Sequence, residues 1–322
     1  MVCMRRRAVL VAGMVLSASA ARGQENRPLR LVVPFPAGGP ADSLARIAAG
    51  ALGERLGQTV VVDNRPGAGG NIAAEYVARS APDGTALLLA GQAIMCINKA
   101  LYPHLSYDPD ADFAFVGMVG GNANVLLLNT TVVPVRDLAG LAERARAEPR
   151  RIAFGSNGAG SLAHLTVEVM ASATGCSFLH VPYRGSAPMQ TDLIAGRIAL
   201  AVTGAPGAVP LLQNPTLRAL AVTTPHRLAA LPDVPTFTEL GVPALNAPSW
   251  FGLFAPAATP APVLARLQEG IQAVNASQAY RDALAKQSSE QLALSPEQAP
   301  EFLRAERATW SQAVRSSGAT VE

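Results

Sequence analysis

The sequence predicts a two-domain α/β protein in which each domain is a mostly parallel sheet flanked by helices. Strand-like apolar runs alternate with helical patterns along the 322 residues, as is typical of α/β proteins. The first half also resembles the second, whereas the helical region from Trp250 onward has no counterpart in the middle. We therefore expect the chain to leave the first domain near Gly121–Val125 and to return near Pro248–Pro256. Two hinge strands would join the domains, and a ligand would bind between them.

Short apolar runs bounded by turn residues predict the strands, and apolar residues at helical spacing predict the helices. The predicted strands are Leu29–Phe35, Thr59–Asp63, Ala86–Ala90, Phe113–Val119, Val125–Asn129, Arg151–Gly155, Ser177–Pro182, Ile198–Thr203, Leu217–Thr223 and Trp250–Ala255. The predicted helices are Asp42–Leu56, Asn71–Ser80, Val135–Ala147, Ser161–Thr174, Ala187–Ala195, Pro206–Leu212, Thr236–Leu240, Pro262–Asn275, Ser277–Lys286 and Glu297–Ser316. The last helix has the clearest start, with Ser295 as N-cap, Pro296 at N1 and Gln298 at N3.

The internal resemblance centres on two glycine-rich loops. Residues 30–46 read "RLVVPFPAGGPADSLAR" and residues 151–164 read "RIAFGSNGAGSLAH". Ser43 and Ser161 occupy matching places, and Arg65 and Arg184 follow them after 22 residues (43 to 65) and 23 residues (161 to 184). Each loop joins a strand to the positive end of a helix, which suits an anion. The two helix N-termini are therefore expected to face each other across a cleft.

The N-terminus reads as an export signal. Arg5–Arg7 form a basic region, Ala8–Leu16 is apolar, and Ala18-Ser19-Ala20 matches a small-x-small cleavage site. We predict a signal peptide over residues 1–20, cleaved near Ala20; an uncleaved anchor and the choice between Sec and Tat export stay open.

The mature chain is predicted to carry no net charge. Three of the 26 Lys and Arg residues lie in the signal peptide, which leaves 23 against 23 Asp and Glu. A neutral chain gives no indication of nucleic-acid binding. With no second apolar stretch of membrane-spanning length, the mature protein is expected to be soluble. Cys96 and Cys176 form either a disulfide or two buried thiols, and no spacing typical of a metal site occurs.

Several polar residues near the two loops have alternative interpretations. Asp42 is either the N-cap of the first helix or a group that contacts a ligand or buttresses the loop. Arg184 could hold a carboxylate or tie loops to backbone carbonyls. Tyr183 either lines the cleft or packs in the core, and His164 is either a ligand contact or a packing residue. Asn71 after "PGAGG" is predicted to cap the second helix.

Nucleotide binding and catalysis find little support. The segment Gly158–Ala163 matches G-x-G-x-x-A, but no acidic residue occurs in Cys176–Ala187, where a dinucleotide-binding protein would have one. No Walker A sequence or G-x-S-x-G elbow is found, and no nucleophile–base pair is evident. We expect no cofactor, no metal and no enzymatic activity.

Six blocks then resemble a known family. They are "VPFPAGGPADSLAR", "NRPGAGGNIAAEYVARSAPDGTALLLA", "FGSNGAGSLAHL", "VPYRGSAPMQTDLIAGRIAL", "LRALAVTTPHRLAALPDVPTFTELG" and "WFGLFAPAATP". In this order they resemble the Bug family, the extracytoplasmic solute receptors of tripartite tricarboxylate transporters. The resemblance implies a type II periplasmic-binding (Venus flytrap) fold. Domain 1 would comprise residues 27–122 and 248–322, and domain 2 residues 123–247.

The resemblance also implies a function and a site. The chain would be a periplasmic, monomeric receptor that binds a small carboxylate and delivers it to a permease of one large and one small membrane subunit. A receptor that signals to a sensor kinase and a secreted carboxylate-acting enzyme are the alternatives. In the family, facing glycine loops hold the carboxylate through backbone amides, hydroxyls and waters. The implied ligand-binding residues are Phe35, Ala37, Gly38, Gly39, Asp42, Gln92, Ser156, Asn157, Gly158, Ser161, His164, Tyr183 and Arg184.

The far end of the ligand is less defined by the resemblance. Pro40 and Ala41 stand where the family often has a Ser or Thr, so one hydroxyl is missing from the first loop. Gln92 and Met95 are placed where the far end would be recognised. Because Gln92 is uncharged, a neutral or water-bridged far group is favoured.

Overall fold

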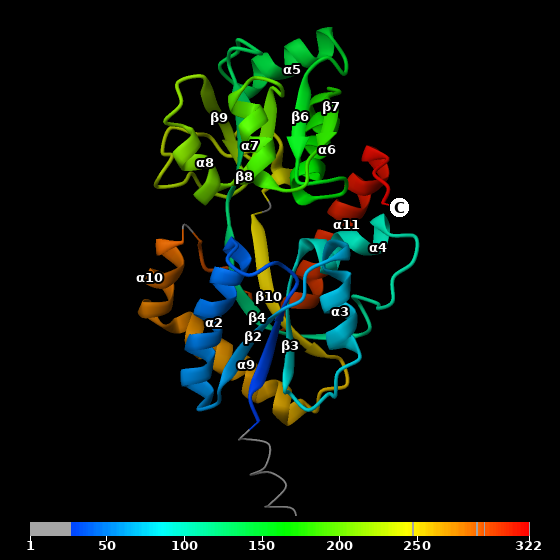
Figure 1. The fold of residues 1–322 in the computed structure, drawn as a ribbon, viewed down its shortest axis with the longest axis vertical. Coiled ribbons are helices and arrows are strands. Elements are labelled where there is room, and N and C mark those ends of the chain that lie inside the picture. The colour runs from blue at the N-terminus through cyan, green and yellow to red at the C-terminus, as the bar shows by residue number, and fades with distance from the viewer. Residues whose placement is uncertain (1–26, 247, 288, 293, 322) are drawn as a thin grey trace, which may run out of the picture.

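The structure is a computed structural model that describes residues 27–246, 248–287, 289–292 and 294–321. The predicted signal peptide, residues 1–20, lies outside these residues. Two lobes stand one above the other in Figure 1, each built on a five-stranded sheet. We call them the first lobe, which contains β1, and the second lobe, which contains β6.

The sheet of the first lobe has the strand order β2-β1-β3-β10-β4. Its strands are β1 (Leu29–Val33), β2 (Val60–Asn64), β3 (Ala86–Gly91), β4 (Phe113–Asn122) and β10 (Ser249–Pro256). β1 pairs in parallel with β2 and β3, whereas β10 is antiparallel to both β3 and β4. Its single antiparallel strand is thus the one that reaches the sheet from the other lobe.

The sheet of the second lobe repeats this topology, with the order β7-β6-β8-β5-β9. Its strands are β5 (Asn124–Asn129), β6 (Ala153–Ser156), β7 (Leu179–Pro182), β8 (Leu200–Gly204) and β9 (Leu217–Val222). Here β5, which arrives directly from β4, is the antiparallel strand. The prediction of two similar α/β units with mostly parallel sheets is therefore confirmed.

Helices cover both faces of each sheet (Figure 1). In the first lobe they are α2 (Pro40–Leu56), α3 (Asn71–Ala78), α4 (Asn98–Leu101), α9 (Ala261–Ala276), α10 (Gln278–Lys286) and α11 (Ala299–Ser317). In the second lobe they are α5 (Leu138–Ala147), α6 (Leu162–Thr174), α7 (Ser186–Ile194) and α8 (Ala205–Leu211). Three short helical turns, η1 (Ala68–Gly70), η2 (Ala93–Ile97) and η3 (Pro243–Leu245), complete the described elements. None of the described helices is long and apolar enough to cross a membrane.

Some helix starts differ from their predictions. α2 begins at Pro40 rather than Asp42, because Gly39 is its N-cap and proline is well tolerated in the first turn. Gly70 occupies the N-cap position of α3, so Asn71 is a helical residue rather than the cap. Residues 236–240 form a turn beside an isolated bridge from Thr236 to Val222, not a helix.

Two further differences concern helical segments: the first residue of α11 and the presence of η2. α11 begins at Ala299, although Gln298 Oε1 does accept the Ser295 N–H at 3.1 Å, as in a capping box. The π-helical turn η2 was not predicted, because its apolar residues continue the run of β3 without a turn signal.

Cys96 in η2 and Cys176 are free thiols, so the disulfide alternative is wrong. Burial raises the pKa of Cys96.

The C-terminal helix α11 ties the two lobes together. It packs against η2 and α4 of the first lobe and against α6 of the second, as Figure 1 shows at the right of the cleft. Its Glu306 carboxylate is partly buried and accepts the indole N–H groups of Trp250 on β10 at 2.8 Å and Trp310 at 3.1 Å. Burial raises the pKa of Glu306. The strand that returns from the second lobe is thereby fixed to α11.

Candidate functional site

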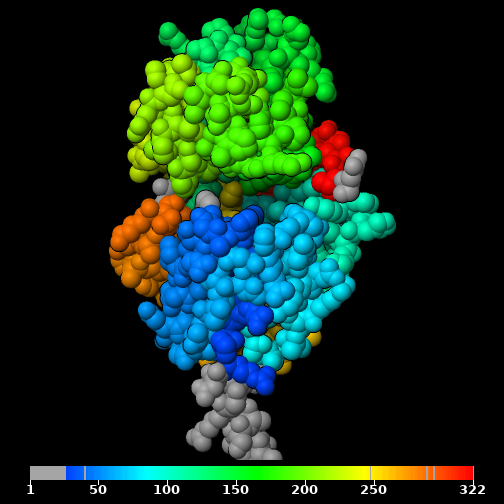
Figure 2. All heavy atoms as spheres, in the orientation of Figure 1, coloured from blue at the N-terminus to red at the C-terminus, as the bar shows by residue number. Residues whose placement is uncertain are grey.

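A cavity of about 790 Å³ lies between the lobes, within the range of small-molecule sites. The first lobe contributes Pro34–Pro36, the loop before α3, η2 with α4, and the hinge residues Asn122, Ser249 and Phe251. The second lobe contributes the loop before α6, α7 and the β8–α8 corner. None of the described residues that line it is charged. Figure 2 shows how closely the two lobes approach at this waist.

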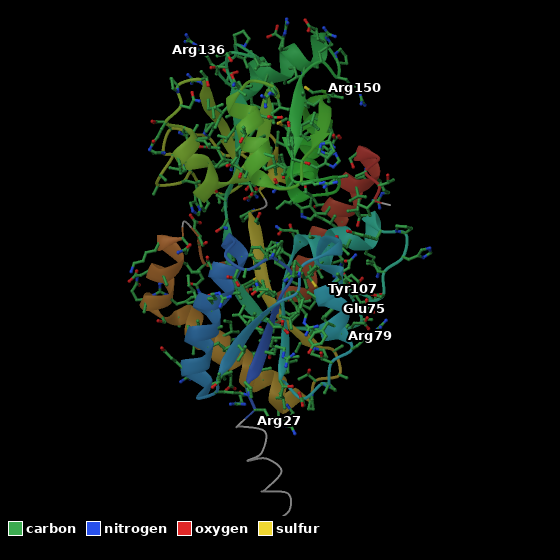
Figure 3. All side chains as sticks on the ribbon, viewed as in Figure 1. Arg27, Glu75, Arg79, Tyr107, Arg136 and Arg150 are labelled. Atoms are coloured by element: carbon green, nitrogen blue, oxygen red, sulfur yellow. The ribbon has the colours of Figure 1, made fainter. Side chains whose placement is uncertain are left out.

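A groove of equal volume on the outer face of the first lobe is a weaker candidate. It is lined by arginines, but these are already paired: Arg79 with Glu75 at 2.6 Å, and Arg65 with Asp63 at 3.0 Å. Figure 3 shows Arg27, Glu75 and Arg79 on the lower half of the first lobe, away from the cleft. Within the described residues, no group of His, Cys, Asp and Glu could hold a metal ion.

The first glycine loop meets the cavity through its N-terminal half. Phe35 lines the cavity, is 38% exposed, and packs edge-on against Phe251, with ring centroids 5.9 Å apart. Ala37, Gly38 and Gly39 follow at the loop surface and do not line the cavity. Gly38 has a φ of +83°, a conformation that side chains rarely adopt. The loop thus depends on Gly38 for its shape and on Phe35 for its cavity wall.

Asp42 buttresses this loop. Its side chain is buried and accepts four hydrogen bonds: from Gly38 N–H at 2.9 Å, Asn64 Nδ2 at 2.9 Å, and Arg46 at 2.9 and 3.0 Å. The Arg46 hydrogen bond is the main cause that lowers the pKa of Asp42 to about 2. The N-cap interpretation of Asp42 is wrong, since Gly39 is the N-cap. Asp42 does not line the cavity, and its carboxylate is fully engaged within the first lobe.

The second glycine loop lines the cavity with Asn157, Ala159, Gly160 and Ser161. Ser161 is the N-cap of α6 and accepts the backbone N–H of His164 at 3.3 Å. Neighbouring residues give the loop its shape and lie off the cavity wall. They are Ser156, whose buried hydroxyl accepts the Gly158 N–H at 3.1 Å, and Gly158 itself, with a φ of +124°.

A stacked histidine pair supports the second loop from beneath. The His164 and His180 rings lie 3.7 Å apart and nearly parallel, and Phe154 stacks on His180 at 4.9 Å. His164 Nδ1 accepts the Gly160 N–H at 3.0 Å, and His180 Nε2 lies 2.6 Å from Ser156 Oγ. Through this contact His164 supports the loop, and its side chain does not line the cavity. The contribution of His180 was not predicted, because this residue lies on an apolar strand and belongs to no motif.

Burial, followed by the neighbouring His164, lowers the pKa of His180 to about 4 from an ordinary value of 6.5. A histidine with a depressed pKa stabilises the fold above pH 6.5, and this contribution is lost as the pH falls toward 4. Between pH 6.5 and 4, unfolding should therefore be accompanied by the uptake of about one proton at His180. Because His180 is partly solvated, we expect the free energy of unfolding to fall by only about 1–2 kcal/mol across this range.

Chemical denaturation between pH 4 and 7 measures this effect. His180→Phe should flatten the slope of unfolding free energy against pH, because phenylalanine keeps the stacking but does not titrate. His104→Gln, in a surface loop, is the control and should leave the slope unchanged. An unaltered slope in His180→Phe would contradict the assignment.

The remaining predicted residues lie at the edge of the site or outside it. Gln92 lines the cavity, but its amide donates to Pro248 O at 2.7 Å and accepts the Trp250 N–H at 3.1 Å. Tyr183 donates to Asp192 Oδ2 at 2.8 Å inside the second lobe, and burial raises its pKa to about 12. Arg184 is exposed, and neither it nor Tyr183 lines the cavity.

Several cavity residues were not predicted. They lie in the loop before α3, on α7 and at the β8–α8 corner: Pro66, Gly67, Gly69, Gly70, Ser186, Gln190, Thr203, Gly204, Pro206 and Gly207. The "PGAGG" segment was a visible signal for the first group, since it repeats the strand–glycine loop–helix pattern. The residues of α7 and β8 carry no comparable motif.

Two α/β lobes joined by crossing strands, with a neutral cavity between them, define a solute-binding protein. The sequence model of the tripartite tricarboxylate transporter family receptor, TctC, matches residues 44–318. The chain belongs to this family, which includes the Bug receptors, and is a binding protein rather than an enzyme. Protein BugT of Bordetella pertussis is 36% identical over 297 residues, which cover 92% of this chain and 91% of BugT.

Solved structures of relatives agree with this assignment. Rpa4515 of R. palustris, determined with adipate, superposes with a TM-score of 0.78 at 37% identity and covers 91% of this chain and 98% of its own. MatC from Rhodopseudomonas palustris with bound malate has a TM-score of 0.75 at 29% identity, with coverages of 89% and 99%. The periplasmic binding protein BugD also has a TM-score of 0.75, at 30% identity, with coverages of 92% and 99%.

Proposed function

We propose that this chain is a periplasmic receptor that binds a small carboxylate-containing metabolite between its lobes. It would then deliver the metabolite to the permease of a tripartite tricarboxylate-type transporter. The observation that carries the proposal is the uncharged interlobe cavity flanked by two glycine loops, in a family whose relatives were solved with adipate and malate. Export by the predicted signal peptide and a monomeric state belong to the same proposal.

The two loops supply donors for a carboxylate without a salt bridge. Within the described residues, the backbone N–H groups of Ala37 and Gly39 in the first loop form no hydrogen bond. The same is true of Asn157 and Ala159 in the second. Each loop precedes a helix of more than ten residues, α2 or α6, whose positive end favours an anion. Oxygen atoms of a ligand, or of waters bound to it, would accept hydrogen bonds from these N–H groups.

Binding would favour closure of the lobes, because the two loops belong to opposite lobes and closure would bring the Ala37 and Gly39 N–H groups, which lie off the present cavity wall, toward the ligand. A ligand shifts an equilibrium toward the state in which it makes more contacts. We propose residues 27–122 with 248–322 and residues 123–247 as the two moving bodies. The hinge would then include Asn124, whose amide donates to Ser249 Oγ at 2.9 Å between the two crossing strands.

Thermal unfolding of the mature chain, residues 21–322, tests this function. Bound ligand is first removed by unfolding and refolding, and mono-, di- and tricarboxylates, amino acids and aromatic acids are then added separately. We expect a concentration-dependent rise in melting temperature for at least one acid, as ligand linkage requires. A response to sugars, peptides or metal ions alone would overturn the proposal.

A further inference from the structure

The two walls of the cavity differ in chemistry. The first-lobe wall is mainly apolar and includes Phe35, Phe251, Ile94 and Leu101. The second-lobe wall presents hydroxyl and amide groups, such as those of Ser161 and Gln190. An exposed phenylalanine at a cleft mouth offers an apolar surface to whatever fills the cleft. The cavity is thus shaped for a molecule with an apolar body and polar ends.

Two amides at the first-lobe side of the cavity are already satisfied by the protein. Gln92 bridges the backbone of Pro248 and Trp250, as described above. Asn98 donates to Gly69 O at 3.1 Å and also to the side chain of Asn71. A ligand that recruited either amide would have to break these bonds, so both act as supports of the wall.

By contrast, Gln190 on α7 and Thr203 on β8 form no side-chain hydrogen bond within the described part of the chain. They also converge on one point. A Cβ placed on Gly207 would lie 3.2 Å from Gln190 Nε2 and 3.3 Å from Thr203 Oγ1. Gly207 is helical and its φ is ordinary, so its conformation does not require glycine. The lack of a side chain at Gly207 keeps both polar groups accessible.

The chemistry of this pair indicates the group that it would bind. Gln190 and Thr203 each offer both a donor and an acceptor. A hydroxyl or a carboxamide can use both kinds, whereas a carboxylate accepts only from the Gln190 amide N–H and the Thr203 hydroxyl and leaves the Gln190 carbonyl oxygen without a partner. Among the described residues, no charged side chain lines the cavity to compensate for that second negative charge.

We propose that Gln190 and Thr203, with Gly207 between them, form a subsite that recognises the far end of the ligand. The ligand class is a monocarboxylate whose apolar body ends in a hydroxyl or carboxamide group. This inference rests on the proposed function, because it assumes that the glycine loops hold the single carboxylate. The body of the ligand then lies along Phe35 and Phe251.

Calorimetric titration of ligand-free protein with two matched triads tests the subsite. One triad is hexanoate, 6-hydroxyhexanoate and adipate; the other is benzoate, 4-hydroxybenzoate and terephthalate. In at least one triad, we expect the hydroxylated acid to bind about tenfold more tightly than both other members. Gln190→Leu should remove that advantage, so that the hydroxylated acid binds no more tightly than the unsubstituted acid.

Gly207→Ala provides a second, conservative variant, since alanine is favourable in a helix but would cover the two polar groups. It should weaken the hydroxylated acid about tenfold, whereas Gly50→Ala, at an open helical glycine on α2, should not. Thermal unfolding verifies that both variants fold. If a dicarboxylate binds most tightly and neither Gln190→Leu nor Gly207→Ala alters the ranking, the subsite is refuted while the proposed function stands. If no acid of any kind binds, both proposals fail.

Discussion

Gly38→Ala is expected to weaken carboxylate binding at least tenfold. Gly38 has a φ of +83°, and an alanine there costs about 1–2 kcal/mol of backbone strain. A Cβ at this position meets no atom within 4 Å, so the strain is relieved by a change of loop conformation rather than by a clash. That change displaces Phe35, which lines the cavity, and the free N–H groups of Ala37 and Gly39. Titration with the acid found in the thermal screen measures the loss.

Gly57→Ala is the matched control for this substitution. Gly57 ends the same helix α2, has a φ of +63°, and also has open space around its Cβ position. It should therefore lower the unfolding free energy by an amount similar to Gly38→Ala but leave the affinity unchanged. Equal affinities for Gly38→Ala and Gly57→Ala would show that the first loop does not contribute to binding.

Asp42→Asn is expected to destabilise the protein by about 2–3 kcal/mol and to weaken binding as well. The two oxygens of Asp42 accept four hydrogen bonds, from Gly38, Asn64 and twice from Arg46. An asparagine keeps the shape but must turn its NH₂ group toward two donors, whichever way it is oriented. Chemical denaturation gives the stability, and ligand titration gives the affinity.

The stabilisation by native Asp42 should depend on pH, because its carboxyl has a lowered pKa. Because its pKa is lowered to about 2 from 3.8, its stabilising contribution is complete above pH 3.8 and is lost as the pH falls toward 2. Arg46→Ala removes only the exposed partner and keeps the bonds from Gly38 and Asn64, so it should lower the free energy of unfolding by less than Asp42→Asn does. If Arg46→Ala lowers the free energy of unfolding as much as Asp42→Asn does, then Asp42 stabilises the protein through its ion pair with Arg46 rather than through its contact with the loop.

The sequence alone determined the two-lobed α/β architecture. Strand and helix periodicity is a local property, and the strand–glycine loop–helix pattern occurs twice, before α2 and before α6. These patterns placed most elements within a few residues of their observed bounds. The exceptions, such as the π-helical turn η2 and the turn at residues 236–240, are segments whose local pattern fits more than one structure.

The roles of individual site residues were decided only by the tertiary structure. Asp42 reads as a helix cap in sequence, but Asn64, 22 residues away, completes its bonds to the loop. The His164 ring stacks on His180, which lies on another element, β7. Gln190 and Thr203 converge only because α7 and β8 both pack beside Gly207. The physical reason is that a side chain's hydrogen-bond partners and its access to the cavity depend on which elements pack beside it. Periodicity predicts that an element exists, whereas the packing of distant elements fixes what each side chain can bind.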